Sequence, residues 1–154
     1  MKKNLLELDY QEVIGLNKNV TKIYNIKNNS NQPHVLVKQN ELKSCLAGIF
    51  ARDFIGTYYN IPIEKMAGLL LYRIAQGQFF MDGNKRTAIL SMKFFLFNNG
   101  INILIKGKEL EELTWGFAVK KYNDIDSIQS QRRRRLIQKK NQNYTRIWSN
   151  LIGT

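Results

Sequence analysis

Residue types that build many common functional sites are scarce in this chain. Its 154 residues include one cysteine, one histidine and two prolines. A single thiol can form neither an internal disulfide nor a CxxC redox or metal site. We therefore interpret Cys45 as a small core residue.

Long hydrophobic runs are also missing. No apolar stretch approaches the roughly 20 residues of a membrane-spanning helix. Near the N-terminus, Asn4, Glu7 and Asp9 interrupt any hydrophobic core of a signal peptide. We therefore expect no membrane partner and a cytoplasmic location. The length and the 44% hydrophobic content are those of one globular domain.

Acidic residues are few. The chain has 12 Asp and Glu against 24 Lys and Arg, which gives a formal net charge of +12. Much of the excess lies near the C-terminus, where residues 126–154 are expected to form a basic helical tail. Three interpretations stay open: a solvated helix, a contact to nucleic acid or the ribosome, and a docking site for an acidic partner. The basic cluster of the tail consists of Arg132, Arg133, Arg134, Arg135, Lys139 and Lys140.

Residues 82–86, Asp-Gly-Asn-Lys-Arg, place an acid, a glycine, an amide and two cations between two apolar helical patterns. A helix that begins there directs free backbone N–H groups and the positive end of its dipole at the loop, which favours a bound phosphate. Lys85 and Arg86 can reach phosphate oxygens, and Asp82 is a natural ligand for Mg²⁺. The alternative interpretation is a polar loop between two core helices.

Apolar residues at helical spacing predict four helices. One of them is apolar around its whole circumference, which predicts a buried central helix, and Asn99 and Gly100 end it. The predicted helices span residues 40–58, 63–74, 84–98 and 108–121.

The remaining segments have weaker patterns. Residues 1–29 are expected to form one or two short helices, because Gly15 and clusters of asparagine limit longer ones. Residues 32–37 are expected to be extended, since Pro33 disfavours helix immediately before it. Residues 101–105 alternate in polarity and predict a short strand.

Residues 78–88, QFFMDGNKRTA, resemble the signature motif of the Fic/Doc superfamily. They are most similar to the Doc (death-on-curing) branch, whose motif reads His-x-Phe-x-Asp-(Gly/Ala)-Asn-Lys-Arg-Thr-Ala. Residues 64–75 and 109–117 resemble the helices that flank the motif in this family. The resemblance covers residues 30–122.

The resemblance implies a mainly α-helical fold. Residues 1–125 would form a Fic/Doc helical bundle around a central helix, followed by the basic tail. A short β-hairpin flap at His34, Val35 and Leu36 would lie beside the motif and bind a target segment by strand pairing. We interpret His34 as a solvated loop residue, and the alternative is that it faces the nucleotide site from the flap.

The resemblance also implies a chemistry. Family members use ATP and Mg²⁺ to move a phosphate-containing group onto a hydroxyl of a protein substrate. By this resemblance Asp82 would hold Mg²⁺, and Phe80 would anchor the loop in the core. Lys85, which is glycine in most AMP-transferring members, favours transfer of the γ-phosphoryl group. The implied phosphate cradle consists of Gly83, Asn84, Lys85 and Arg86, of which the last two are also expected to be catalytic.

Gln78 departs from the family motif, in which a histidine takes the proton from the attacking hydroxyl. An amide has no protonation equilibrium near neutral pH and cannot act as this base. Loss of a general base typically costs about two to four orders of magnitude in rate, whereas positioning and charge stabilisation survive the loss. Gln78 is either natural, as in a pseudoenzyme, or an inactivating substitution in a toxin.

The sequence therefore indicates two alternative functions. The first is a Doc-like toxin-type transferase impaired by Gln78, whose protein substrate could belong to the translation machinery. The second is a non-catalytic Fic-fold pseudoenzyme that binds nucleotide, nucleic acid or a partner protein. The chain contains no Ser/Thr-x-x-x-Glu-Gly/Asn inhibitory motif, so restraint of any activity would fall to a separate antitoxin.

Overall fold

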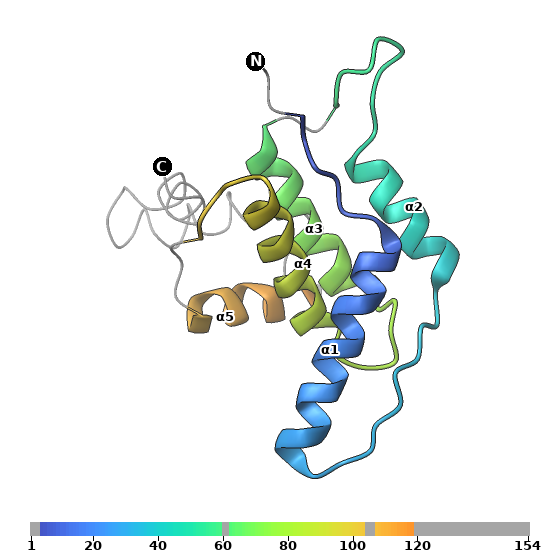
Figure 1. Ribbon diagram of the computed structural model, residues 1–154, viewed down its shortest axis with the longest axis vertical. Coiled ribbons are helices and arrows are strands. Elements are labelled where there is room, and N and C mark those ends of the chain that lie inside the picture. Colours follow the sequence, from blue (N-terminus) through green and yellow to red (C-terminus); the bar gives the residue numbers. More distant parts are fainter. Residues whose placement is uncertain (1–3, 60–61, 104–106, 119–154) are drawn as a thin grey trace.

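Helices make up most of the computed structural model, which describes residues 4–59, 62–103 and 107–118. Two central helices lie side by side, and the others pack around them (Figure 1). The expected mainly α-helical bundle around a central helix is confirmed. Within the described residues the helices are α1 (Tyr10–Asn28), α2 (Gln39–Ile49), α3 (Ile63–Gly77), α4 (Asn84–Asn98) and α5 (Gly107–Ala118).

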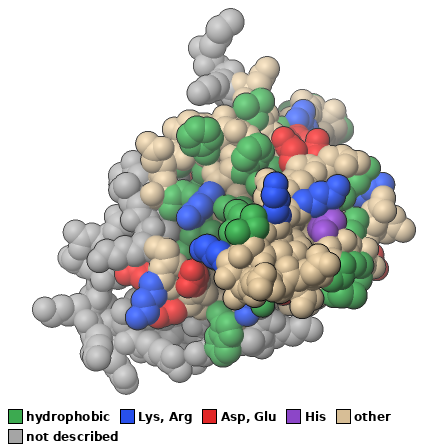
Figure 2. Space-filling model, turned by 60° about the horizontal axis from the view of Figure 1, so that its bottom comes forward, with side chains coloured by type: hydrophobic (Ala, Val, Ile, Leu, Met, Phe, Trp, Pro, Cys, Tyr) green, Lys and Arg blue, Asp and Glu red, His purple; other side chains and the backbone are tan. Residues whose placement is uncertain are grey.

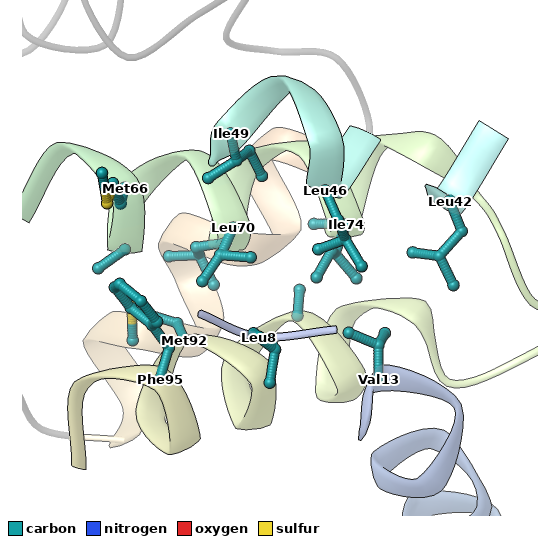
Figure 3. Packing of buried hydrophobic residues seen from close by; sticks show 14 of the residues in the cluster. Leu8, Val13, Leu42, Leu46, Ile49, Met66, Leu70, Ile74, Met92 and Phe95 are labelled. Carbon is teal, nitrogen blue, oxygen red and sulfur yellow. The ribbon is translucent and has the colours of Figure 1, made fainter. Parts of the chain in front are cut away.

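The central helices α3 and α4 supply much of the core because each has an apolar face at helical spacing. Leu70 and Ile74 of α3 pack near Met92 and Phe95 of α4, and all four side chains are no more than 1% exposed (Figure 3). Leu46 of α2 joins the same cluster. Burial of one such side chain stabilises a fold by roughly 1.5–3 kcal/mol. The cluster therefore holds α3 against α4 and fixes the ends of the loop between them.

The first helix, α1, is continuous over 19 residues, so the expectation of one or two short helices is wrong. A capping box fixes its start: Asp9 Oδ1 accepts the Glu12 N–H at 2.9 Å, and Glu12 Oε2 accepts the Asp9 N–H at 2.8 Å. Val13 and Val20 lie on the inner face of α1, and both are buried. The cap and this packing outweigh the roughly 1 kcal/mol that Gly15 costs inside a helix.

The helix expected over residues 40–58 ends at Ile49. The chain then makes a tight turn in which Asp53 Oδ1 accepts the N–H groups of Ile55 and Thr57 at 3.0 and 2.8 Å. A carboxylate that takes nearby backbone donors competes with helix formation, and an apolar pattern does not reveal this competition.

The central helix α4 begins and ends as predicted, with Gly100 in the left-handed region at φ 77°. The expected burial around its whole circumference is wrong, because Phe94 is 36% and Phe97 is 74% exposed. The other faces pack on α1, α3 and α5. Just after the helix, the Asn99 side chain exchanges two hydrogen bonds of 2.9 Å with the Leu6 backbone. These bonds tie the N-terminal segment to the end of α4.

The C-terminal part of the described chain is α5, which buries Leu110 and Thr114. Residues 101–103 form no strand, and the rest of that predicted strand lies outside the described residues. The basic tail with its Arg and Lys cluster also lies outside them, so the division at residue 125 stays a prediction. None of the helices described here is long and apolar enough to cross a bilayer.

Gly77 closes α3 at a point where the Phe79 ring leaves no space for a side chain. A Cβ at Gly77 would lie 2.3 Å from Cζ of that ring, and Phe79 is itself buried. We therefore expect Gly77→Ala to lower the free energy of unfolding by about 1–3 kcal/mol. Gly15→Ala is the matched control, because nothing lies within 4 Å of its Cβ position. The control should stabilise the protein by up to about 1 kcal/mol. Urea unfolding of both variants tests this, and equal stabilities would contradict it.

Candidate functional site

The motif loop, residues 78–83, joins α3 to α4 and has a buried and an exposed part. Phe79 and Phe80 are 5% and 2% exposed, so their rings anchor the loop in the core. The Asp82 side chain is exposed. Gly83 then takes φ 77°, a backbone conformation that side chains with a Cβ rarely adopt. The loop therefore displays its carboxylate from a fixed frame.

The side-chain amide of Asn84 holds one edge of this loop. Asn84 is 6% exposed, its Oδ1 accepts the Phe80 N–H at 3.0 Å, and its Nδ2 donates to the Phe80 carbonyl at 2.7 Å. The amide thus pairs with both backbone groups of Phe80 as a neighbouring strand would. Any contribution of Asn84 to a phosphate cradle would come from its backbone N–H, because its side chain is engaged with the loop.

The opposite edge of the loop pairs with the flap segment, residues 35–37. The Val37 N–H donates to the Phe79 carbonyl at 2.8 Å, and the Met81 N–H donates to the Val35 carbonyl at 2.9 Å. These two bonds make one isolated antiparallel bridge. The flap is therefore not the β-hairpin that we expected. It is one extended segment, which satisfies its inner edge by pairing with the motif loop itself.

The side chain of Asn17, a residue of α1, links the motif loop to α4 and to the start of the flap. It is 1% exposed, and its Nδ2 donates to the Asp82 carbonyl at 3.0 Å and to Thr87 Oγ1 at 2.9 Å. Its Oδ1 lies 2.6 Å from Nδ1 of His34. Sequence reasoning missed Asn17. The available signal was a polar residue on the core-facing stripe of α1.

His34 is half-buried in the flap segment. Its ring centroid lies 5.8 Å from that of Phe80. Burial, and to a smaller extent the positive charge of Lys18, lower the pKa of His34 from its usual 6.5. The histidine lies on a face that also carries several Lys and Arg side chains (Figure 2).

The N-terminus of α4 has no side-chain cap, because its N-cap residue is Gly83. The first bond of the helix runs from the Thr87 N–H to the Gly83 carbonyl at 2.8 Å. The N–H groups of Asn84, Lys85 and Arg86 therefore have no helical carbonyl to bind. Such a terminus carries partial positive charge and binds anions. The exposed side chains of Lys85 and Arg86 add two full positive charges beside it.

Asp82 is the carboxylate that precedes this helix terminus. Its side chain is 55% exposed, and Oδ2 lies 3.7 Å from Nη2 of Arg86, whose guanidinium lies 4.8 Å from the centre of the Tyr24 ring. No group of three or more His, Cys, Asp or Glu that could hold a metal ion occurs in the part of the chain that the structure describes. One carboxylate nevertheless fits a Mg²⁺ ion that substrate phosphates and water also bind.

Gln78 ends α3 in the left-handed region, at φ 51°. Its Nε2 donates to the Ala75 carbonyl at 3.1 Å, and its Oε1 accepts from Asn84 Nδ2 at 3.3 Å. This position can orient the loop but cannot take a proton. The structure brings the sequence-predicted residues Gln78, Phe80, Asp82, Gly83, Asn84, Lys85 and Arg86 into one loop and helix terminus, with His34, Val35 and Leu36 alongside.

Asn84→Ala should destabilise the loop, because the buried N–H and C=O of Phe80 lose their partner. We expect the free energy of unfolding to fall by about 1–3 kcal/mol and amide exchange at Phe80 to accelerate. Lys93→Ala, an exposed position on the same helix, is the control and should change stability by less than about 0.5 kcal/mol. Unchanged exchange at Phe80 in the Asn84 variant would show that this side chain does not hold the loop.

Comparison with protein-family models finds the Fic/DOC family over residues 7–96. The match includes α1, the flap, the motif loop and most of α4, and it begins further upstream than the resemblance noted from the sequence. Comparison with curated proteins finds no match. Because the family match covers more than half of the sequence, this chain belongs to the Fic/DOC family.

Proposed function

We propose that this protein is a Doc-like, toxin-type transferase that uses ATP and Mg²⁺ to modify a hydroxyl of a protein target, and that Gln78 impairs it. One observation carries the proposal: the N-terminus of α4 is uncapped and lies between the exposed cations of Lys85 and Arg86 and the carboxylate of Asp82. Membership of the Fic/DOC family supports a Fic-type transferase.

Phosphate groups suit this helix terminus. The backbone N–H groups are fixed by the helix, the Lys85 ammonium offers a point charge, and the Arg86 guanidinium can bind two phosphate oxygens. The Arg86–Asp82 pair is long at 3.7 Å and half-exposed, so it is weak. A nucleotide with Mg²⁺ would separate the pair by giving the guanidinium a phosphate and the carboxylate a cation.

Transfer of the γ-phosphoryl group is favoured over transfer of AMP. The support comes from the family resemblance, in which Lys85 stands where AMP-transferring members mostly have glycine. Those members also carry a second arginine, which would fall at Ile89 of this chain. An isoleucine carries no charge, so Ile89 cannot replace that arginine. Its side chain is half-buried and packs against the core.

The protein target is proposed to bind along the flap. In the bridge between Leu36 and Phe80, the N–H and C=O of Leu36 point away from the loop. No hydrogen bond to these two groups is seen within the described ranges of the chain. An extended target segment could add to this edge as a further strand and run beside the loop.

A non-catalytic pseudoenzyme is the second candidate. The hydrogen bonds of Gln78 favour it, because both ends of the amide are bound within the loop that it occupies. Such a protein would keep its binding of nucleotide, nucleic acid or a partner and lose group transfer. A separate antitoxin, a role of the basic tail in binding and a cytoplasmic location are proposals under either candidate.

Gln78→His should restore the missing base. Each protein is incubated in a bacterial lysate with Mg²⁺ and ATP labelled at the α or the γ position. We expect the variant to label a protein from the γ position faster than the unsubstituted chain, by a factor of about 10²–10⁴. Lys85→Ala in the Gln78→His background is the control, and it should remove labelling without unfolding, because Lys85 is exposed.

Calorimetric titration with ATP separates the two candidates. Binding without labelling by either protein would support the pseudoenzyme. Labelling from the α position would contradict phosphotransfer. Absence of both binding and labelling would contradict a nucleotide site at this loop.

A further inference from the structure

One face of α1 lies against the motif loop and the start of α4. Asn17, Val20 and Tyr24 share this face, because they stand at the helical spacing i, i+3 and i+7. Asn17 Nδ2 donates to the Asp82 carbonyl at 3.0 Å, and Cζ of Arg86 lies 4.8 Å from the centre of the Tyr24 ring. This face of α1 therefore contacts two charged residues of the motif.

The closest packing between α1 and the loop is at Gly83. A Cβ at Gly83 would lie 3.0 Å from Cγ1 of Val20 and 3.3 Å from Nδ2 of Asn17. The Asp82 carbonyl belongs to the peptide unit that ends at Gly83, and it accepts the hydrogen bond from Asn17. This peptide is therefore held against α1 by a hydrogen bond on one residue and by packing on the next.

The hydrogen-bond partners of Asn17 fix the orientation of its amide. The Asp82 carbonyl can only accept, so Asn17 presents Nδ2 to it, and the same Nδ2 donates to Thr87 Oγ1 at 2.9 Å. Oδ1 of Asn17 then faces Nδ1 of His34 at 2.6 Å, and an amide oxygen can only accept as well. Nδ1 of His34 therefore carries the hydrogen, and the flap holds the amide in the orientation that binds the Asp82 carbonyl.

The carboxylate of Asp82 depends on its backbone for its position. The side chain is 55% exposed, and its ion pair with Arg86 is long at 3.7 Å. A cation site needs its ligands held to within about 0.5 Å of the binding geometry. A mobile peptide would add backbone freedom to the rotamer freedom of an exposed side chain, and binding a cation would then cost more entropy. The hydrogen bond from Asn17 removes the backbone part of this cost.

We propose that Asn17 is a positioning residue for the cation that Asp82 would bind. Its amide holds the Asp82 peptide against α1 and so keeps the carboxylate beside the N-terminus of α4, where the nucleotide phosphates would bind. The inference rests on the proposed function, because it concerns the same site. It does not depend on the base that is missing at Gln78.

Calorimetric titration with ATP tests the proposal through binding alone. Each protein is titrated once with Mg²⁺ and once with a chelator instead, and the ratio of the two association constants is called the metal gain. Asn17→Leu keeps the approximate size of the side chain and removes its hydrogen bonds. We expect this variant to lower the metal gain by about 10–100-fold. The affinity for ATP without Mg²⁺ should stay unchanged, because Lys85, Arg86 and the N–H groups of α4 are retained.

Asn99→Leu is the matched control. The Asn99 side chain also joins distant segments, through two hydrogen bonds of 2.9 Å to the Leu6 backbone, and it lies at the opposite end of α4. Both variants should lose stability in urea unfolding, because each leaves backbone groups without a partner. Only Asn17→Leu should change the metal gain. An equal loss of metal gain in both variants would overturn the proposal, since destabilisation would explain it.

His34→Phe tests the orientation of the amide without changing a fully buried residue, so it remains informative if Asn17→Leu does not fold. The variant keeps a ring beside Phe80 and removes the donor to Asn17. We expect a smaller fall of the metal gain in the same direction. In the unsubstituted protein, nitrogen-15 spectra of the single imidazole report on this bond without nucleotide. A neutral ring with its hydrogen on Nε2 would overturn the proposal, because the amide would then be reversed.

Asp82→Asn separates a role at the cation from a role at the phosphates. In this background the metal gain should already be lost, and Asn17→Leu should lower it no further. A further loss would overturn the role of Asn17 and leave the proposed function standing, and so would an equal fall of the ATP affinity with and without Mg²⁺. If the unsubstituted protein binds ATP under neither condition, the proposed function fails and the inference fails with it.

Discussion

The pair of hydrogen bonds between the Asn84 side chain and the Phe80 peptide is the constraint on which the site depends. It satisfies a buried N–H and a buried C=O that would otherwise be costly to leave unpaired. It also closes one edge of the motif loop and leaves the other edge for the flap. Because Asn84 is the first residue of α4, the same side chain joins the loop to the helix terminus that suits an anion.

Neutral and charged side chains have different places in this site. The buried polar groups that hold its shape are the amides of Asn17 and Asn84, whereas Asp82, Lys85 and Arg86 are all exposed. Burying an amide that is fully hydrogen-bonded costs far less than burying a charge. The charges therefore stay at the surface, where a ligand can reach them, and the frame that supports them does not depend on ionisation.

The sequence predicted α3, α4 and the position of the motif loop well, because apolar spacing along one helix is a local property. It did not predict the continuous α1, since the capping box and the packing against α4 outweigh the local cost of Gly15. The role of Asn17 was also missed. It depends on donors and acceptors brought together by tertiary structure, which no local pattern encodes.

The bonds of Asn17 join residues that are 65 and 70 positions apart in the chain, and those of Asn99 reach back 93 positions to Leu6. Contacts at such separation require the long loops between the partners to close first, which costs chain entropy. During synthesis α1 leaves the ribosome first, with the polar group on its inner face still unpaired. The N-terminus of α4, the flap edge and the contacts of Asn17 come together only once α4 has been made, so a nascent chain that stops before α4 lacks the site.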